Sequence, residues 1–419
     1  MNAELIAVGT ELLLGQIINT NARYLSERLA ELGINVYFHT VAGDNRVRLL
    51  NTLAVASDRV DLVITTGGLG PTGDDLTKET LAEYLNLPLE IVPAELERLK
   101  ELFLRRRLPW VDNNAKQAAF LKGSFILKND RGTAPGLAFK HQGKAYILLP
   151  GPPREMEHMF YTYAIPWLQE NLLPPNTAGL HSKVLKFLGI SESKLAESLE
   201  DILAAQQEVT IAPLAKTGGE IHLRLTTKAV SQQDFLAKIQ PALAEIKKQV
   251  GKYLVAEDEE SPSQALGELL KEKGLTVSTA ESCTGGLLSA SLTSVPGSSS
   301  YYLGSVIAYS NEMKNKMLAI PQALIEEKGA VSAEVASLLA GNIRTLTGSS
   351  IGLGITGVAG PDGGTPDKPV GLVYIALSSA EFTWCQGYNF LGDRHTIRLR
   401  SVNTALNLVR KFLHEEHEQ

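Results

Sequence analysis

The sequence of 419 residues predicts an α/β protein with parallel sheets covered by helices. Short apolar runs of strand length alternate with amphipathic helical segments in both halves of the chain, as in proteins built on parallel sheets. Several runs end in turns rich in Gly and hydroxyl residues, at the carboxyl ends of strands where such sheets bind ligands. Hydrophobic residues make up 44% of the chain and charged residues 21%, which is enough for a sizeable core.

Composition limits the expected partners and compartment. A net charge of −6 gives no electrostatic footprint for nucleic acid, so direct nucleic-acid binding is not expected. The two cysteines, Cys283 and Cys385, lie far apart in sequence, which fits a reducing compartment and excludes a disulfide framework. The N-terminus enters a strand without a basic region or a long apolar segment. We therefore expect a cytoplasmic protein without membrane contact.

The first part of the chain reads as alternating strands and helices. Asn21 is expected to cap the first long helix and Gly33 to end it, and Pro153 to open the last helix of this part. The carboxyl ends of the first and third strands then carry Gly9-Thr10-Glu11 and a glycine-rich loop. The expected elements are strands at 3–8, 34–41, 62–66, 125–127, 136–140 and 145–149, and helices at 22–32, 46–57, 93–107 and 153–169.

The glycine-rich loop, GGLGPTGDDLT at 67–77, predicts a phosphate site. Three of its glycines satisfy G-x-G-x-x-G, but Pro71 interrupts the pattern and the loop follows the third strand rather than the first, so we do not interpret it as a dinucleotide fingerprint. Its backbone N–H groups are expected to cradle phosphate, with Asp74 or Asp75 holding a divalent cation. The alternative is a turn in which an Asp caps a helix.

The remaining chain predicts a small α+β segment and a second α/β unit. The acidic run at 257–260, followed by Ser261-Pro262, is interpreted as a linker between them. The expected elements of the small segment are strands at 181–188, 209–213 and 221–227 and helices at 191–203 and 234–250. Those of the second unit are helices at 263–273, 285–293, 333–347 and 394–413, a helix beginning near 310, and strands at 275–280, 305–309, 351–355, 371–377 and 382–390.

The turn after strand 275–280 gathers the reactive side chains of the C-terminal unit. Glu281, Ser282, Cys283 and Thr284 follow one another there, ahead of a helix whose first N–H groups have no partners within the helix. Such a turn is a ready site for an anion or an oxyanion.

Motifs along nearly the whole chain resemble those of the CinA family of bacterial competence/damage-inducible proteins. The motifs occur in the family's order: VGTELLLGQIINTNARYL, TTGGLGPTGDDLT, LPGPPREM, AESCTGG, PGSSSYY, AYSNEMK, GITGVAGPDGG and GDR. The resemblance implies a three-layer N-terminal domain (1–172) similar to the molybdopterin-binding fold of MoaB and MogA. It also implies a KH-like middle domain (173–256) and a C-terminal domain (257–419) similar to the nicotinamide-nucleotide amidase PncC.

The resemblance further implies two activities in pyridine nucleotide salvage. The C-terminal domain would hydrolyse nicotinamide mononucleotide to nicotinic acid mononucleotide and ammonia without a cofactor. The N-terminal domain would cleave ADP-ribose with a divalent metal ion. Its expected ligand contacts are phosphate binding by Gly67, Gly68, Gly70 and Thr72, metal binding by Asp74 and Asp75, and ribose or second metal contacts by Thr10, Glu11, Asn19 and Asn21.

Amide hydrolysis needs a nucleophile, a base that later protonates ammonia, and donors for the oxyanion. The C-terminal domain lacks zinc-ligand spacing and its few histidines come late, which leaves Ser with Lys as the economical pair. Lysine acts as a base only when its pKa is lowered, and Lys314, at the start of a helix, is the expected base.

The family's pattern points to Ser299 as the nucleophile, with Ser282 as a substrate or oxyanion residue, but the sequence does not separate these two serines. Cys283 is the rival nucleophile, and we interpret it instead as a small packed residue because it has no placed His partner. Tyr309 is expected to relay a proton or stack on nicotinamide, and Arg394 to clamp phosphate. Further expected substrate contacts are Thr284, Gly285, Thr356, Gly357 and Gly360.

Other interpretations remain open at this point. The N-terminal domain would instead bind a pterin if it keeps the function of its fold, and the whole chain would be a non-catalytic adaptor of recombination if the competence name describes it. The family leads us to expect a homodimer that acts on small nucleotides.

Overall fold

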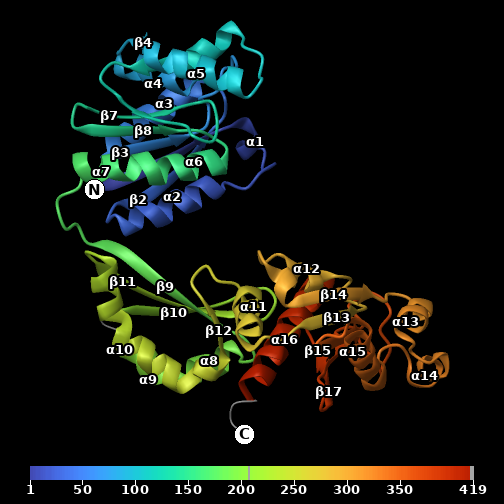
Figure 1. Cartoon of the computed structure of the whole chain (residues 1–419). Helices are drawn as coiled ribbons and strands as arrows, with labels where there is room; N and C mark the ends of the chain where they lie inside the picture. The colour runs from blue at the N-terminus through green and yellow to red at the C-terminus, as the bar shows by residue number, and fades with distance from the viewer. Residues whose placement is uncertain (206–207, 416–419) are drawn as a thin grey trace. The chain divides into compact units, whose positions relative to one another are not determined.

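A computed structural model describes residues 1–205 and 208–415 (Figure 1). The chain divides into two compact units, one of residues 1–181 with 228–237 and one comprising the rest. The expected mixed α/β class is confirmed. Within the described ranges, no helix is long and apolar enough to cross a membrane.

The first unit is built on a six-stranded sheet in the order β2-β1-β3-β8-β7-β6. Its strands are β1 (Asn2–Val8), β2 (Asn35–Ala42), β3 (Leu62–Thr66), β6 (Phe125–Leu127), β7 (Gly136–His141) and β8 (Lys144–Leu149). The first three and β8 pair in parallel, so their carboxyl ends meet at one edge, whereas β6 and β7 are antiparallel additions. A short ribbon of β4 (Leu89–Ile91) and β5 (Ala119–Leu121) stands beside this sheet.

Helices cover both faces of this sheet, as Figure 1 shows. One face carries α2 (Thr20–Glu31), α6 (Pro153–Met159), a π-helical turn (Phe160–Ala164) and α7 (Ile165–Asn171); the other carries α3 (Arg46–Arg59) and α4 (Thr77–Leu85). The short α1 (Thr10–Leu13) follows β1, and α5 (Pro93–Arg105) follows β4. The expected capping residue of α2 was wrong: Asn19 accepts the N–H of Ala22, while Asn21 lies inside the helix and donates to the carbonyl of Gly151.

The middle segment forms a four-stranded sheet in the order β10-β11-β9-β12. Its elements are β9 (Gly179–Phe187), α8 (Glu192–Ser198), α9 (Glu200–Ala204), β10 (Thr210–Ala215), β11 (Ile221–Ala229), α10 (Gln232–Val250) and β12 (Leu254–Glu257). The acidic run connects β12 to the helix that begins at Pro262, as the linker interpretation expected, but it is not a free linker. Lys183 on β9 forms ion pairs with Glu257 (2.7 Å) and Asp258 (2.9 Å), so the run is fixed to this sheet.

The C-terminal sheet has five strands in the order β14-β13-β15-β16-β17. They are β13 (Val277–Glu281), β14 (Tyr302–Ile307), β15 (Ile351–Gly357), β16 (Leu372–Ser378) and β17 (Thr383–Asn389). One face packs against α11 (Pro262–Lys273), α12 (Leu287–Thr293) and α16 (Arg394–Glu415), and the other against α13 (Asn311–Leu318), α14 (Gln322–Lys328) and α15 (Ala333–Thr347).

Two glycines let α15 lie close to the centre of this sheet. A Cβ atom on Gly352 or Gly354 would come within 2.1 Å or 2.3 Å of a backbone carbonyl of α15. Both positions therefore require glycine, and the close packing fixes β15 beside β13. The parallel strands β13, β14 and β15 thus end at one edge, which is where the expected reactive residues lie.

Candidate active site

Three strand ends converge at the carboxyl edge of the C-terminal sheet. Ser282 directly follows β13, Tyr309 lies two residues beyond β14, and Thr356 is the penultimate residue of β15. Ser282 is tied to the neighbouring strand because its N–H donates to the carbonyl of Ile355 at 3.0 Å. The parallel registers of β13 with β14 and β15 therefore bring these segments together.

Glu281 shapes the turn that carries Ser282. Its fully buried carboxylate accepts the N–H groups of Gly286 (3.0 Å), Leu288 (3.1 Å) and Ser289 (2.8 Å), and also the Ser289 hydroxyl. These are the donors that a helix start leaves unpaired, so the carboxylate anchors α12 to the end of β13. Gly285 and Gly286 adopt φ of 58° and 90°, which lets the chain turn this tightly.

Lys314 extends from α13 to Ser282. Its Nζ atom lies 3.1 Å from Ser282 Oγ, 3.0 Å from the carbonyl oxygen of Ala308 and 3.2 Å from that of Tyr309. The lysine is only 2% exposed and Ser282 7%. Ser310 caps α13 by accepting the N–H of Met313, which fixes the helix that presents the amine.

Burial lowers the pKa of Lys314, because the charged ammonium loses its hydration there; the Cys283 thiol opposes the shift weakly. A charged amine would donate to all three oxygens. When it loses a proton, two N–H bonds suffice for the two carbonyls, and the lone pair can face Ser282 Oγ. The arrangement can thus accept the serine proton without rearrangement of the backbone.

The structure does not bring Ser299, the expected nucleophile, close to Lys314, the expected base. Val277, the first residue of β13, pairs with Tyr302, the first of β14, so Ser299 precedes the amino ends of these strands. Lys314 lies beyond their carboxyl ends, and the length of β14 alone separates the two edges by about 17 Å. Ser299 is exposed on a short helical turn, Ser298–Ser300.

Cys283 has the features of a packed residue rather than a nucleophile. It is 6% exposed within the hydrophobic core, and burial raises the pKa of its thiol to about 12. The thiolate, which is the reactive form, is therefore scarce near neutral pH.

Two arginines of α16 reach the same edge. Arg394 donates to Tyr309 Oη (2.8 Å) and to the carbonyl of Gly360 (2.7 Å), which joins two of the expected contacts. Arg398 donates through Nε and Nη2 to the carbonyl of Thr284 at 3.2 and 2.6 Å. Sequence reasoning missed Arg398, although its spacing of four residues from Arg394 places both on one helix face.

The remaining expected substrate contacts differ in whether their polar groups already form hydrogen bonds within the protein. Thr356 donates to the carbonyl of Ala330 at 2.8 Å, so its hydroxyl keeps only acceptor capacity for another group. The Thr284 hydroxyl is fully buried, and no partner is found for it among the described residues. Gly357 ends β15, and Gly285 approaches Arg398.

A second group of expected residues lies at the carboxyl edge of the N-terminal sheet. The Gly67–Thr72 loop follows β3, Thr10 and Glu11 follow β1, and Gly151 follows β8 closely. A Cβ on Gly67 would meet the Val8 carbonyl at 2.2 Å, so this loop requires glycine where it passes β1. Thr10 donates its N–H and hydroxyl to Asp44 at 2.9 and 2.8 Å, a carboxylate that sequence reasoning missed.

The loop brings Asp74 and Asp75 beside Thr72. Asp75 accepts the N–H (3.0 Å) and hydroxyl (2.5 Å) of Thr72, and a Cβ on Gly70 would meet Asp75 Oδ2 at 2.4 Å. Lys116, also missed, donates to the Thr72 carbonyl at 3.2 Å and contacts the carbonyl of Asp75.

Across the part of the chain that the structure describes, no cluster of three or more His, Cys, Asp or Glu side chains could hold a metal ion. A magnesium ion commonly binds one or two carboxylates and takes its other ligands from substrate phosphates and water. Asp74 and Asp75 on the glycine-rich loop could supply these one or two carboxylates.

Asn19 and Asn21 line a cleft of about 290 Å³ with Glu11, Ile17 and Pro152. The amide of Asn21 is oriented by its bond to Gly151 and 8% exposed. The cleft adjoins the carboxyl ends of β1, β3 and β8, and its apolar walls suit part of an organic ligand.

Comparison with known proteins covers the whole chain. Residues 4–170 match the family model described as "Probable molybdopterin binding domain", residues 182–256 the "Damage-inducible protein CinA KH domain", and residues 259–413 the "CinA C-terminal domain". A "CinA-like protein" of Dictyoglomus turgidum is 48% identical over 413 residues, which cover 99% of each chain, and that of Dictyoglomus thermophilum is equally similar. A crystal structure of the competence/damage inducible protein CihA from Agrobacterium tumefaciens covers 36% of this chain and 92% of its own, with 34% identity and a TM-score of 0.35.

Proposed function

This chain belongs to the CinA family, and from that premise we propose that its C-terminal domain is a nicotinamide-nucleotide amidase of the serine–lysine type. The observation that carries the proposal is the 3.1 Å approach of the buried Lys314 amine to Ser282 Oγ. Burial favours the neutral form of the amine, which is the form a general base needs, and the two carbonyl acceptors hold the amine in place.

In the proposed reaction, Ser282 Oγ attacks the carbonyl carbon of the nicotinamide amide while Lys314 takes the hydroxyl proton. The backbone N–H groups that follow Ser282 in the turn would donate to the oxyanion. Lys314 then returns the proton to the departing nitrogen, ammonia leaves, and an ester with Ser282 remains. Lys314 next removes a proton from water, which attacks the ester carbon. The bond from that carbon to Ser282 Oγ breaks, Lys314 returns the proton to Oγ, and the carboxylic acid leaves.

The neighbouring residues take supporting roles in this proposal. Arg394 would bind the substrate phosphate, and Tyr309 would lie against the nicotinamide ring or relay a proton. Thr284, Gly285, Thr356, Gly357 and Gly360 would contact the substrate from the turn and the strand ends. None of these roles requires a metal ion.

Substitution of the two serines tests the proposal. Ser282→Ala and Lys314→Met should each reduce ammonia release from nicotinamide mononucleotide by a factor of about 10³ or more, because either removes a group from the reacting pair. Ser299→Ala is the matched control and should retain activity. Loss of activity in Ser299→Ala, with Ser282→Ala unaffected, would reverse the assignment.

We also propose that the N-terminal domain is a metal-dependent ADP-ribose pyrophosphatase. Support comes from the glycine-rich loop at a sheet edge, the two carboxylates Asp74 and Asp75, and the adjacent cleft. In this proposal the loop would hold the diphosphate of the substrate through its N–H groups, and Asp74 and Asp75 would hold a divalent ion that offsets the phosphate charge. AMP formation from ADP-ribose, with and without a chelator, tests this activity.

The alternative for this domain is binding of a molybdopterin-like ligand, which the description of the family model for residues 4–170 favours. Tight pterin binding without ADP-ribose cleavage would support the alternative. Our proposal further includes a cytoplasmic homodimer that acts on small nucleotides rather than on nucleic acid. A monomer in light scattering would contradict the dimer.

A further inference from the structure

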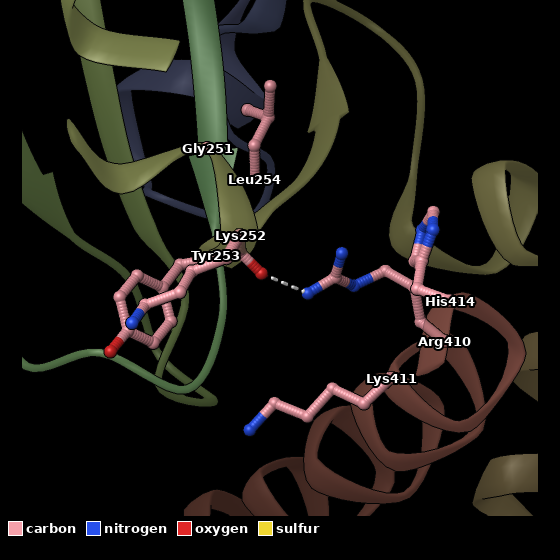
Figure 2. Close-up of a pocket in the computed structure, with 7 residues that line it drawn as sticks. All are labelled: Gly251, Lys252, Tyr253, Leu254, Arg410, Lys411 and His414. Atoms are coloured by element: carbon pink, nitrogen blue, oxygen red, sulfur yellow. Dashed lines mark hydrogen bonds between the residues drawn. The ribbon is translucent and has the colours of Figure 1, made fainter. Parts of the chain in front are cut away.

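A cavity of about 620 Å³ lies in the second compact unit, away from the residues proposed for catalysis. Its wall is formed by the segment between α10 and β12 and by the last turns of α16 (Figure 2). We call it the basic pocket. It is lined by Gly251, Lys252, Tyr253, Leu254, Arg410, Lys411 and His414.

Arg410 is held in place at the centre of this wall. Its Nη2 donates to the carbonyl of Lys252 at 2.6 Å, as Figure 2 shows, and its Nε donates to Asn407 Oδ1 at 3.3 Å. A guanidinium has five N–H groups, so these bonds leave donors for a further acceptor. Because two N–H groups of the guanidinium are already bonded within the protein, little rotamer freedom would be lost when Arg410 binds a ligand.

The charge of the lining is unusual for a chain with a net charge of −6. Lys252, Arg410 and Lys411 are basic, His414 becomes so on protonation, and no acidic residue is among the seven that line the cavity. Burial lowers the pKa of Arg410, which reflects the cost of desolvating a cation in this wall. A bound anion would offset the repulsion between these positive charges and the free-energy cost of desolvating Arg410.

Stabilisation of the helix alone explains only some of the basic residues that line the pocket. Cations in the last turn of a helix stabilise its negative end, which accounts for basic residues on α16 alone. Lys252 belongs to another element, and its side chain and carbonyl contribute to the same wall as Arg410. The Tyr253 ring, with the Lys252 amine 5.2 Å from its centroid, adds a flat surface beside the charges.

We propose that the basic pocket binds a phosphate-bearing ligand of about nucleotide size, at a place separate from the two proposed active sites. Arg410 supplies the oriented donors, Lys252 and Lys411 supply point charges, and Tyr253 offers a surface for a ring. The same helix carries Arg394 and Arg398 at its other end, so a ligand here would contact the element that leads to the candidate amidase site.

Calorimetric titration of the full chain with inorganic pyrophosphate and, separately, with AMP tests this proposal. A chelator is present throughout, to suppress metal-dependent binding by the N-terminal domain. Lys411→Gln should weaken one class of binding sites about tenfold, and Lys252→Gln should do the same, because each removes one charge from the pocket. Lys194→Gln is the matched control: this exposed lysine forms an ion pair with Glu197 and is not among the residues that line the pocket.

The arms of this experiment separate the possible results. Tighter binding of AMP than of pyrophosphate would indicate a nucleotide ligand, and tighter binding of pyrophosphate would indicate a simple phosphate ligand. Either result supports the site if Lys411→Gln and Lys252→Gln weaken the binding. Binding unchanged in both variants, or absent from the wild-type chain, would overturn the proposal. Arg410→Lys keeps the charge but loses the fixed fork, so it should weaken binding while the thermal midpoint shows that the chain remains folded.

Discussion

At the scale of single residues, burial decides which groups can react. Lys314 and Cys283 lie within the same small region, yet desolvation acts on them in opposite chemical directions. It lowers the pKa of the amine, which favours the form that can accept a proton, and it raises the pKa of the thiol, which disfavours the nucleophilic thiolate. These shifts support our proposal that the hydroxyl of Ser282, beside the amine, is the nucleophile.

We predict that kcat/KM for nicotinamide mononucleotide rises with pH as Lys314 loses its proton. Because burial lowers the pKa of this amine, the midpoint should fall below the ordinary lysine value of about 10.4. The same shift should make folding stability rise with pH between the folded and unfolded values, since the unfolded chain binds the extra proton there. A pH–rate profile checks the midpoint, and activity that falls with pH across this range would contradict the role of Lys314.

Cys283→Ala should retain most of the amidase activity, because a thiol with a pKa near 12 supplies almost no thiolate. Loss of a small buried side chain should cost about 1 kcal/mol of stability. Ammonia release per folded molecule, normalised by the unfolding transition, separates the two effects. A folded but inactive variant would return the cysteine to consideration as nucleophile.

Lys314, Tyr309 and Arg394 could be proposed as site residues from the sequence, and the structure brings these three to one sheet edge. The sequence could not separate Ser282 from Ser299, because each lies in a short segment rich in glycine and hydroxyl residues, AESCTGG and PGSSSYY. The distinction depends on whether a serine precedes or follows a strand, together with the register of β13 on β14. Arg398 was missed for a related reason, since its partner is a backbone carbonyl far away in sequence.

At the scale of elements, the turn between β13 and α12 is organised by Glu281. We predict that Glu281→Gln lowers ammonia release and destabilises the chain by about 1–3 kcal/mol, because an amide NH₂ would face the N–H donors that the carboxylate now accepts. Denaturant unfolding measures the loss. Glu268→Gln removes the same charge from an exposed position on α11 and should have little effect. Equal losses of stability in the two variants would contradict the role of Glu281 in organising the turn.

Most strands and helices could be predicted from periodicity, and three were placed with the same bounds as in the structure, β3, β6 and α15. The errors arose where tertiary contacts decide. Asn19 and Asn21 are equally good caps in sequence, but only the contact with Gly151 draws Asn21 away. Helix α4 was missed because it begins directly at the end of the glycine-rich loop.

At the scale of the whole molecule, the two proposed active sites lie in different compact units. We predict that Asp75→Asn abolishes cleavage of ADP-ribose but leaves ammonia release unchanged, because the carboxylate has no part in the serine–lysine chemistry. Conversely, Ser282→Ala should leave AMP formation unchanged. Parallel assays of both reactions on each variant check this, and loss of both activities in either variant would show that the sites depend on each other.

The most direct test of the central claim is ammonia release from nicotinamide mononucleotide by the purified full-length chain in the presence of a chelator. Our account predicts release that does not require a metal ion and that disappears in Ser282→Ala but persists in Ser299→Ala. No release from the folded wild-type chain, or release that survives in Ser282→Ala, would contradict the assignment of Ser282 and Lys314 as the reacting pair.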